Sequence, residues 1–129
     1  MNIWTNGCYD ILHVGHIALF KYAKSLGDKL IIGIDSDKRV KELKGNGRPF
    51  NNQDDRKEML ESIRFVDEVV IFDTKEEMCD LLLKKNIHTI VIGDDYKNRP
   101  VTGSGIIEDI VFFKKIGNYS TTNYLESEI

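Results

Sequence analysis

Two histidines stand three residues apart near the start of the chain, in the segment TNGCYDILHVGH at residues 5–16. The first hydrophobic run ends just before Gly7, and a helical pattern begins near His16. On a first helical turn, His13 and His16 would lie on the same side of the helix. The N-terminus of a helix carries free N–H groups and a positive dipole, which favour a bound phosphate. Imidazoles placed there can donate hydrogen bonds to a phosphoryl group in its transition state.

The same pair of histidines has simpler interpretations. The two rings could ligate zinc, although the sequence shows no obvious third ligand. They could also cap a helix and take no part in chemistry. The patterns G-x-G-x-x-G and G-K-[S/T] are absent from the sequence, which argues against a Rossmann dinucleotide site and against a P-loop.

The elements that must position the histidines follow from the alternation of hydrophobic runs with helical patterns. Runs rich in isoleucine and valine, typical of buried parallel strands, lie at residues 2–5, 29–34, 66–72, 89–93 and 109–113. Apolar residues at helical spacing predict helices near residues 19–26, 59–63 and 78–85. This order predicts an α/β fold, a doubly wound, Rossmann-like parallel sheet of about five strands with helices on both faces.

In such a sheet, ligands bind beyond the carboxyl ends of the strands, where the strand order reverses. The turn after the first strand would lie at this edge. The polar stretch KGNGRPFNNQDD at residues 44–55 is predicted to be a mobile loop over the same edge. Lys44 and Arg48 stand beside glycines in this stretch, so they could move towards a bound phosphate, although charged runs are usually solvated faces.

The bulk composition narrows the class of protein. A length of 129 residues predicts a single domain covering residues 1–129. The net charge of −3 disfavours nucleic acid or an anionic membrane as the main partner. The apolar runs are far shorter than a membrane span, and the first residues lack the pattern of a signal peptide. Two cysteines are too few for a disulfide framework, so we expect a cytoplasmic protein.

Motifs over nearly the whole chain resemble those of a known family. GCYDILHVGH is similar to the H-x-G-H signature of the small cytidylyltransferase-like nucleotidylyltransferases. IRFVDEV at residues 63–69, IGDD at 92–95 and STTN at 120–123 follow in the family order. The resemblance implies that a phosphate monoester attacks the α-phosphorus of a nucleoside triphosphate and that pyrophosphate leaves. Catalysis would then rest on positioning and on charge stabilisation.

The resemblance also implies roles for particular residues. The catalytic residues would be His13, His16 and Lys44. The nucleotide would be bound by Cys8, Tyr9, Asp10, Gly15, Asp94, Asp95, Ser120, Thr121 and Thr122. The acceptor phosphate would be bound by Arg48, Arg56 and Arg64. No protein metal site is expected, because Mg²⁺ would enter with the nucleotide, and the protein would be a homodimer.

Several of these residues have structural interpretations as well. Asp10 could orient the turn, bind a Mg²⁺-bound water or form an Asx turn. Arg56 is predicted to begin a helix that Arg64 ends, so Arg64 could instead interact with the C-terminal dipole of that helix. We expect His88 to be structural and Trp4 to lie in the core.

Two branches of the family compete for the substrate assignment. IRFVDEV, GDD and the short spacing from Asp95 to Ser120 resemble glycerol-3-phosphate cytidylyltransferase. TNGCYDILH, LKGNGRPFN and STTN resemble the adenylyltransferase that makes ADP-heptose. The first branch carries a substrate lysine where this chain has Met78, and the second has GGDY where this chain has GDDY.

We therefore expect CTP and a small polyol or sugar phosphate such as glycerol 3-phosphate. The alternative within the family is ATP with heptose 1-phosphate. An alternative of another class is a non-catalytic nucleotide sensor on the same fold. A sensor would be expected to have damaged motifs, whereas both histidines and STT are intact.

Overall fold

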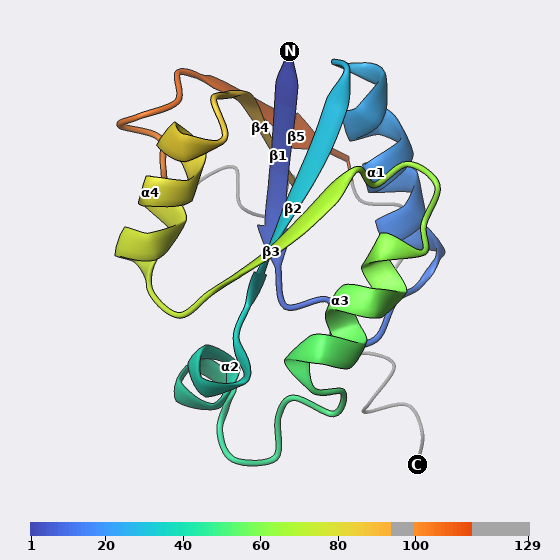
Figure 1. Ribbon diagram of the computed structural model, residues 1–129, viewed down its shortest axis with the longest axis vertical. Coiled ribbons are helices and arrows are strands. Elements are labelled where there is room, and N and C mark those ends of the chain that lie inside the picture. The colour runs from blue at the N-terminus through green and yellow to red at the C-terminus, as the bar shows by residue number, and fades with distance from the viewer. Residues whose placement is uncertain (94–99, 115–129) are drawn as a thin grey trace.

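The structure is a computed structural model that describes residues 1–93 and 100–114. This part of the chain forms one parallel sheet of five strands in the order β3-β2-β1-β4-β5 (Figure 1). The strands are β1 (Asn2–Gly7), β2 (Lys29–Asp35), β3 (Glu68–Phe72), β4 (Ile87–Gly93) and β5 (Asp109–Phe113). The predicted Rossmann-like α/β sheet is therefore confirmed.

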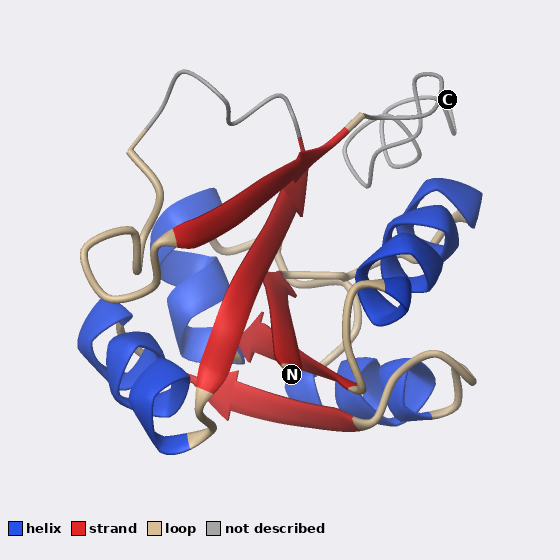
Figure 2. Cartoon of the chain, turned by 90° about the horizontal axis from the view of Figure 1, so that it is seen from above, coloured by secondary structure: helices blue, strands red, loops and turns tan. Residues whose placement is uncertain are grey.

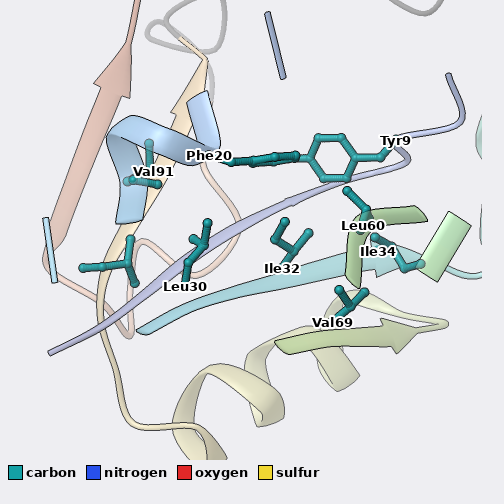
Figure 3. Packing of buried hydrophobic residues seen from close by; sticks show 10 residues of the cluster. Tyr9, Phe20, Leu30, Ile32, Ile34, Leu60, Val69 and Val91 are labelled. Carbon is teal, nitrogen blue, oxygen red and sulfur yellow. The ribbon is translucent and has the colours of Figure 1, made fainter. Parts of the chain in front are cut away.

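Helices cover both faces of this sheet. Within the described residues they are α1 (Val14–Ser25), α2 (Asp37–Lys44), α3 (Gln53–Glu61) and α4 (Lys75–Lys84). Successive side chains of a strand point to opposite faces. Ile32 of β2 shares a core with Phe20 of α1 and Leu60 of α3 (Figure 3), whereas Ile31 shares the opposite core with Met78 of α4. The helices α1 and α3 thus lie on one side of the sheet and α4 on the other (Figure 2).

The strand order reverses beside β1. From β1 the chain continues to β2 and β3 on one side, and it then crosses to β4 and β5 on the other. The carboxyl ends of β1 and β4 therefore border the crevice where ligands of open parallel sheets bind. The turn between β1 and α1, which carries the histidine motif, begins at this crevice (Figure 1).

Trp4 is fully buried in β1, as the sequence predicts. Its indole N–H donates to the side-chain oxygen of Asn6 at 3.0 Å, so the polar atom of the ring is satisfied. On the neighbouring strand, a Cβ atom added to Gly33 would lie 2.2 Å from the Trp4 ring. The glycine in β2 therefore makes the room that the indole occupies.

The helix α2 was not predicted from the sequence. Its buried residue is Val40, so no apolar stripe marks it. The sequence marks only the two ends of this helix. At the start, the Ser36 hydroxyl accepts from the N–H of Arg39 at 3.2 Å. At the end, Gly45 follows the last turn with a φ of 96°. The polar loop therefore begins after Lys44, at the end of this helix.

The limits of α3 also differ from the prediction. The helix begins at Gln53, with Asn52 as its N-cap, and it ends at Glu61. Arg56 thus lies within the first turns, and Arg64 lies beyond the helix. None of the helices in residues 1–93 and 100–114 is long and apolar enough to cross a membrane.

Candidate active site at the carboxyl edge of the sheet

The turn after β1 is held by the side chain of Tyr9. This residue has a φ of 51°, a left-handed conformation that few non-glycine residues adopt. Its ring is buried, and its hydroxyl lies 3.3 Å from both Thr5 Oγ1 and the Asn6 carbonyl oxygen. A Cβ atom at Gly7 would lie 3.1 Å from the same ring. The glycine and the tyrosine together give the turn one tight conformation.

The two histidines of the motif cap α1 with the same atom of each ring. His13 is the N-cap, and its Nδ1 accepts from the N–H of Gly15 at 3.1 Å. His16 Nδ1 accepts from the N–H of His13 at 3.2 Å, which completes a capping box. A neutral imidazole that accepts at Nδ1 carries its proton on Nε2. Both rings are therefore assigned as Nε2–H donors.

Aromatic packing holds these rings in place. The centroids of His13 and His16 are 3.8 Å apart, with the rings tilted by 23°. The ring of Tyr9 meets His16 edge-on at 5.2 Å, and Phe20 lies 6.4 Å from His16 in a nearly parallel orientation. The two histidines thus cap α1, and the same packing fixes the orientation of their rings.

Asp10 is fully buried and binds the loop that follows α2. Its carboxylate accepts from the N–H of Phe50 and from the N–H of Asn51, each at 2.7 Å. Its backbone carbonyl accepts from the side-chain amide of Asn51 at 2.6 Å. These partners are about 40 residues away in the chain, whereas an Asx turn would use a backbone N–H two residues on. Asp10 instead fastens the loop to the turn.

Arg56 is buried completely, which differs from its predicted place on the acceptor phosphate. Its Nη1 donates to the carbonyl oxygens of Cys8 at 2.9 Å and Asp35 at 2.8 Å. Its Nε donates to the Asn51 carbonyl at 3.0 Å, and its Nη2 pairs with the Asp37 carboxylate at 2.8 Å. With these internal partners and no exposed surface, Arg56 acts in this structure as a structural anchor instead of a phosphate ligand.

Arg64 is exposed, and the structure does not bring it to the histidines. Its guanidinium lies 4.9 Å from the centre of the Phe65 ring. A few residues further, the N–H of Asp67 bonds to the carbonyl of Leu30, close to the first residue of β2. This segment therefore lies at the amino edge of the sheet, opposite to the turn that carries the histidine motif (Figure 1).

Lys44 and Arg48 lie nearer to the turn. Lys44 is the exposed last residue of α2. Burial raises the pKa of the Cys8 thiol, and the positive charges of Lys44 and Arg56 oppose this rise. The Nε of Arg48 lies 3.4 Å from the Asp10 carboxylate, while its buried Nη2 has no hydrogen-bond partner in the described part of the chain.

The remaining candidates fall into two groups. Gly15 lies in the first turn of α1, and its N–H donates to Nδ1 of His13, the N-cap of that helix. Asp94, Asp95, Ser120, Thr121 and Thr122 lie outside the described residues. His88 is structural, as predicted, since its Nδ1 accepts from the N–H of Asn2 at 3.1 Å.

Asn51 is the residue that the sequence analysis missed. It touches both Asp10 and Arg56, which places it at the centre of the contacts beneath the turn. The signal in the sequence was the pair of asparagines before α3. Asn52 caps that helix by accepting from the N–H of Asp55 at 2.9 Å. The helix cap accounts for Asn52 and leaves Asn51 without a role that local structure explains.

The sequence of this chain is similar to that of known proteins. Residues 4–124 match the family model described as cytidylyltransferase-like. The bifunctional protein HldE of Aliarcobacter butzleri is 44% identical over 124 residues, covering 96% of this chain and 26% of the relative. The protein of the same name from a Nitratiruptor species is 45% identical over 126 residues, covering 96% and 27%. The chain thus spans about a quarter of the length of these curated relatives.

Two solved structures share the fold. The lipopolysaccharide core biosynthesis protein of Thermoplasma volcanium superposes with a TM-score of 0.75 at 23% identity, over 91% of this chain and 98% of that one. The pantoate-beta-alanine ligase of Francisella tularensis gives a TM-score of 0.60 at 17% identity, over 98% and 68%. These likenesses concern the fold, whereas the family match covers residues 4–124 of the sequence itself. The chain therefore belongs to the cytidylyltransferase-like family of nucleotidyltransferases.

Proposed function

We propose that this chain transfers a nucleotidyl group from a nucleoside triphosphate to a sugar phosphate, with ATP and a heptose phosphate as the favoured pair. The observation that carries the proposal is the pair of oriented imidazoles at the N-terminus of α1. His13 and His16 use Nδ1 for the helix cap, so each ring keeps an Nε2–H donor. This pair belongs to the turn that begins at the crevice where the strand order reverses.

The chemistry needs little from the protein beyond position and charge. An oxygen of the acceptor phosphate forms a bond to the α-phosphorus, the bond from that phosphorus to the bridging oxygen breaks, and pyrophosphate leaves with the electron pair. The attacking oxygen is already an anion, so no general base is required. The Nε2–H groups of His13 and His16 donate hydrogen bonds to phosphoryl oxygens, whose charge grows in the transition state.

Cations beside the turn would complete the site. Lys44, the exposed last residue of α2, would bind phosphate oxygens of the nucleotide. The Nη2 of Arg48, which has no hydrogen-bond partner among the described residues, would bind the same group or the acceptor phosphate. Within residues 1–93 and 100–114, no group of three or more His, Cys, Asp or Glu side chains could hold a metal ion. We therefore propose that Mg²⁺ enters as part of the nucleotide substrate.

The relatives favour ATP and a heptose phosphate over the CTP that the sequence analysis preferred. The similarity to proteins named HldE covers 96% of this chain, and it supports the heptose adenylyltransferase alternative. The segments that resemble that branch, TNGCYDILH and LKGNGRPFN, form the turn and the loop that Asp10 joins. The resemblance to glycerol-3-phosphate cytidylyltransferase rests on IRFVDEV, which lies at the opposite edge of the sheet, and on GDD and the spacing from Asp95 to Ser120. Asp94, Asp95 and Ser120 lie outside the described residues.

A substrate screen tests this proposal. Pyrophosphate release would be measured with four nucleoside triphosphates against heptose 1-phosphate, other sugar phosphates, glycerol 3-phosphate and alditol phosphates. We expect the highest kcat/KM for ATP with heptose 1-phosphate. A preference for CTP with glycerol 3-phosphate would overturn the substrate assignment and keep the reaction class. Nucleotide binding without turnover of any pair would identify a sensor.

A further inference from the structure

A buried guanidinium lies where three segments of the candidate site meet. Arg56 has no exposed surface, and its donors reach the turn after β1 at Cys8, the end of β2 at Asp35 and the loop at Asn51. The acceptors in these three bonds are backbone carbonyls, so Arg56 holds the path of the main chain. Its fourth bond, to the Asp37 carboxylate, balances its charge.

Asn51 gives the same turn a second attachment. Its N–H and its side-chain amide donate to Asp10, while its carbonyl accepts from Arg56. The turn from Cys8 to Asp10 is thus held at its first residue by Arg56 and at its last by Asn51. Planar guanidinium and amide groups suit this task because their donors point in fixed directions.

We propose that Arg56 is a positioning residue for nucleotidyl transfer, which fixes the Cys8–Asp10 turn, and through it the histidines, against the end of β2 and the loop. The inference rests on the proposed function for its kinetic consequence. Arg56 has no exposed surface, so it acts through the main chain that it binds. A lysine at position 56 would keep the positive charge. Its single ammonium group could not reach the four acceptors that the planar guanidinium of Arg56 binds.

The kinetic test compares two arginines that bind the same strand end. Arg39 pairs with the Asp35 carboxylate at 2.8 Å and lies over the ring of Phe72, so Arg39→Lys is the matched control. We expect Arg56→Lys to lower kcat/KM about a hundredfold, the size of effect that follows a small misplacement of catalytic groups. Arg39→Lys should stay within roughly threefold of the wild type, since a lysine can keep the ion pair with the Asp35 carboxylate.

A second pair of variants tests the same role if the Arg56→Lys protein does not fold. Asn51→Ala removes the bond to the Asp10 carbonyl, whereas Asn52→Ala removes only the cap of α3. We expect Asn51→Ala to lose roughly tenfold in kcat/KM, the equivalent of one hydrogen bond at the upper end of the usual range. Asn52→Ala should lower the melting temperature and leave kcat/KM within about twofold of the wild type.

The Cys8 thiol supplies a readout that does not depend on turnover. In a Cys79→Ser background, alkylation of Cys8 by iodoacetamide would be followed at fixed pH in the folded, substrate-free protein. We expect Arg56→Lys to increase the alkylation rate several-fold, because the charge is kept while the turn loosens, and Arg39→Lys to leave it unchanged.

The possible failures are distinguishable. If the wild type transfers no nucleotide to any acceptor, the proposed function fails, and Cys8 alkylation still decides whether Arg56 holds the turn. A folded Arg56→Lys protein with wild-type kcat/KM and wild-type alkylation would overturn the positioning role. Equal losses of kcat/KM in Asn51→Ala and Asn52→Ala would also overturn it, because they would trace the effect to general stability.

Discussion

At the scale of single residues, the two histidines use different ring atoms for different tasks. The Nδ1 atoms of His13 and His16 accept from backbone N–H groups, and this bonding leaves Nε2–H as the donor of each ring. A helix cap therefore sets the tautomer that a phosphoryl group would meet. The structural and the chemical interpretations of this motif are thus compatible, since they concern opposite sides of the same imidazoles.

Replacing His13 by asparagine should separate these tasks. The Asn side-chain oxygen can accept from the N–H of Gly15 as Nδ1 does, and asparagine is among the best N-cap residues. No donor would remain at the position of Nε2. We expect His13→Asn to melt close to the wild type and to lose a hundredfold to a thousandfold in kcat.

His13→Ala is the control for this prediction. It should lose the same activity and also about 1 kcal/mol of stability, because the cap is gone. Thermal melts and pyrophosphate release would be measured on both variants. A His13→Asn protein with a kcat within threefold of the wild type would remove His13 from the catalytic assignment.

At the scale of elements, β1 and β2 fit together through a glycine. A Cβ atom at Gly33 would lie 2.2 Å and 2.4 Å from two atoms of the six-membered part of the Trp4 indole. Gly33→Ala should therefore destabilise the fold by about 1–3 kcal/mol through overpacking. Denaturant unfolding followed by far-UV circular dichroism measures the change in the free energy of unfolding.

A double-mutant cycle identifies the clash as the cause. Trp4→Phe removes the indole atoms that the new methyl group would meet, so the free-energy cost of Gly33→Ala should shrink in that background. Gly47 has nothing within 4 Å of an added Cβ, and Gly47→Ala is the neutral comparison. An equal cost of Gly33→Ala in both backgrounds would contradict the proposed clash.

At the scale of the whole molecule, charged residues join strands at the amino edge of the sheet, away from the histidines. Glu68 of β3 pairs with Lys85, just before β4, at 2.5 Å and with Lys29 of β2 at 3.3 Å. The hydrogen bond from Lys85, followed by that from Lys29, lowers the pKa of Glu68 below its ordinary value of 4.5. A carboxyl whose pKa is lowered by folding stabilises the protein above its unfolded pKa and loses this effect as the pH falls through the folded pKa.

We therefore expect the wild type to lose more thermal stability than Glu68→Gln when the pH falls from neutral to about 3. The amide of the variant does not titrate, so its contribution stays constant. Melting temperatures measured across this range by calorimetry provide the comparison. Parallel pH profiles for the two proteins would mean that the Glu68 pairs do not contribute to stability.

The dependence on Mg²⁺ also belongs to this scale, because it concerns the complete complex with substrate. If the ion enters with the triphosphate, excess EDTA should abolish pyrophosphate release without lowering the melting temperature of the substrate-free protein. Activity should return in proportion to added Mg²⁺. Full turnover in EDTA would contradict the proposal, as would stoichiometric zinc in the purified protein. The homodimer and the cytoplasmic location stay predictions from the sequence.

The sequence by itself determined the class of sheet, its five strands and the place of the histidine turn, because these depend on local periodicity and on motif order. Only the tertiary structure decided what the charged residues do. Asp10 and Arg56 bind partners about 40 and 48 residues away, and no local pattern records such pairings. Arg64 resembles a site residue in the linear motif, yet it lies in the segment after α3, at the opposite edge of the sheet. Contacts between distant segments determine which charged side chains are buried. The burial of Arg56 distinguishes it, as a structural anchor, from a cation that binds a ligand.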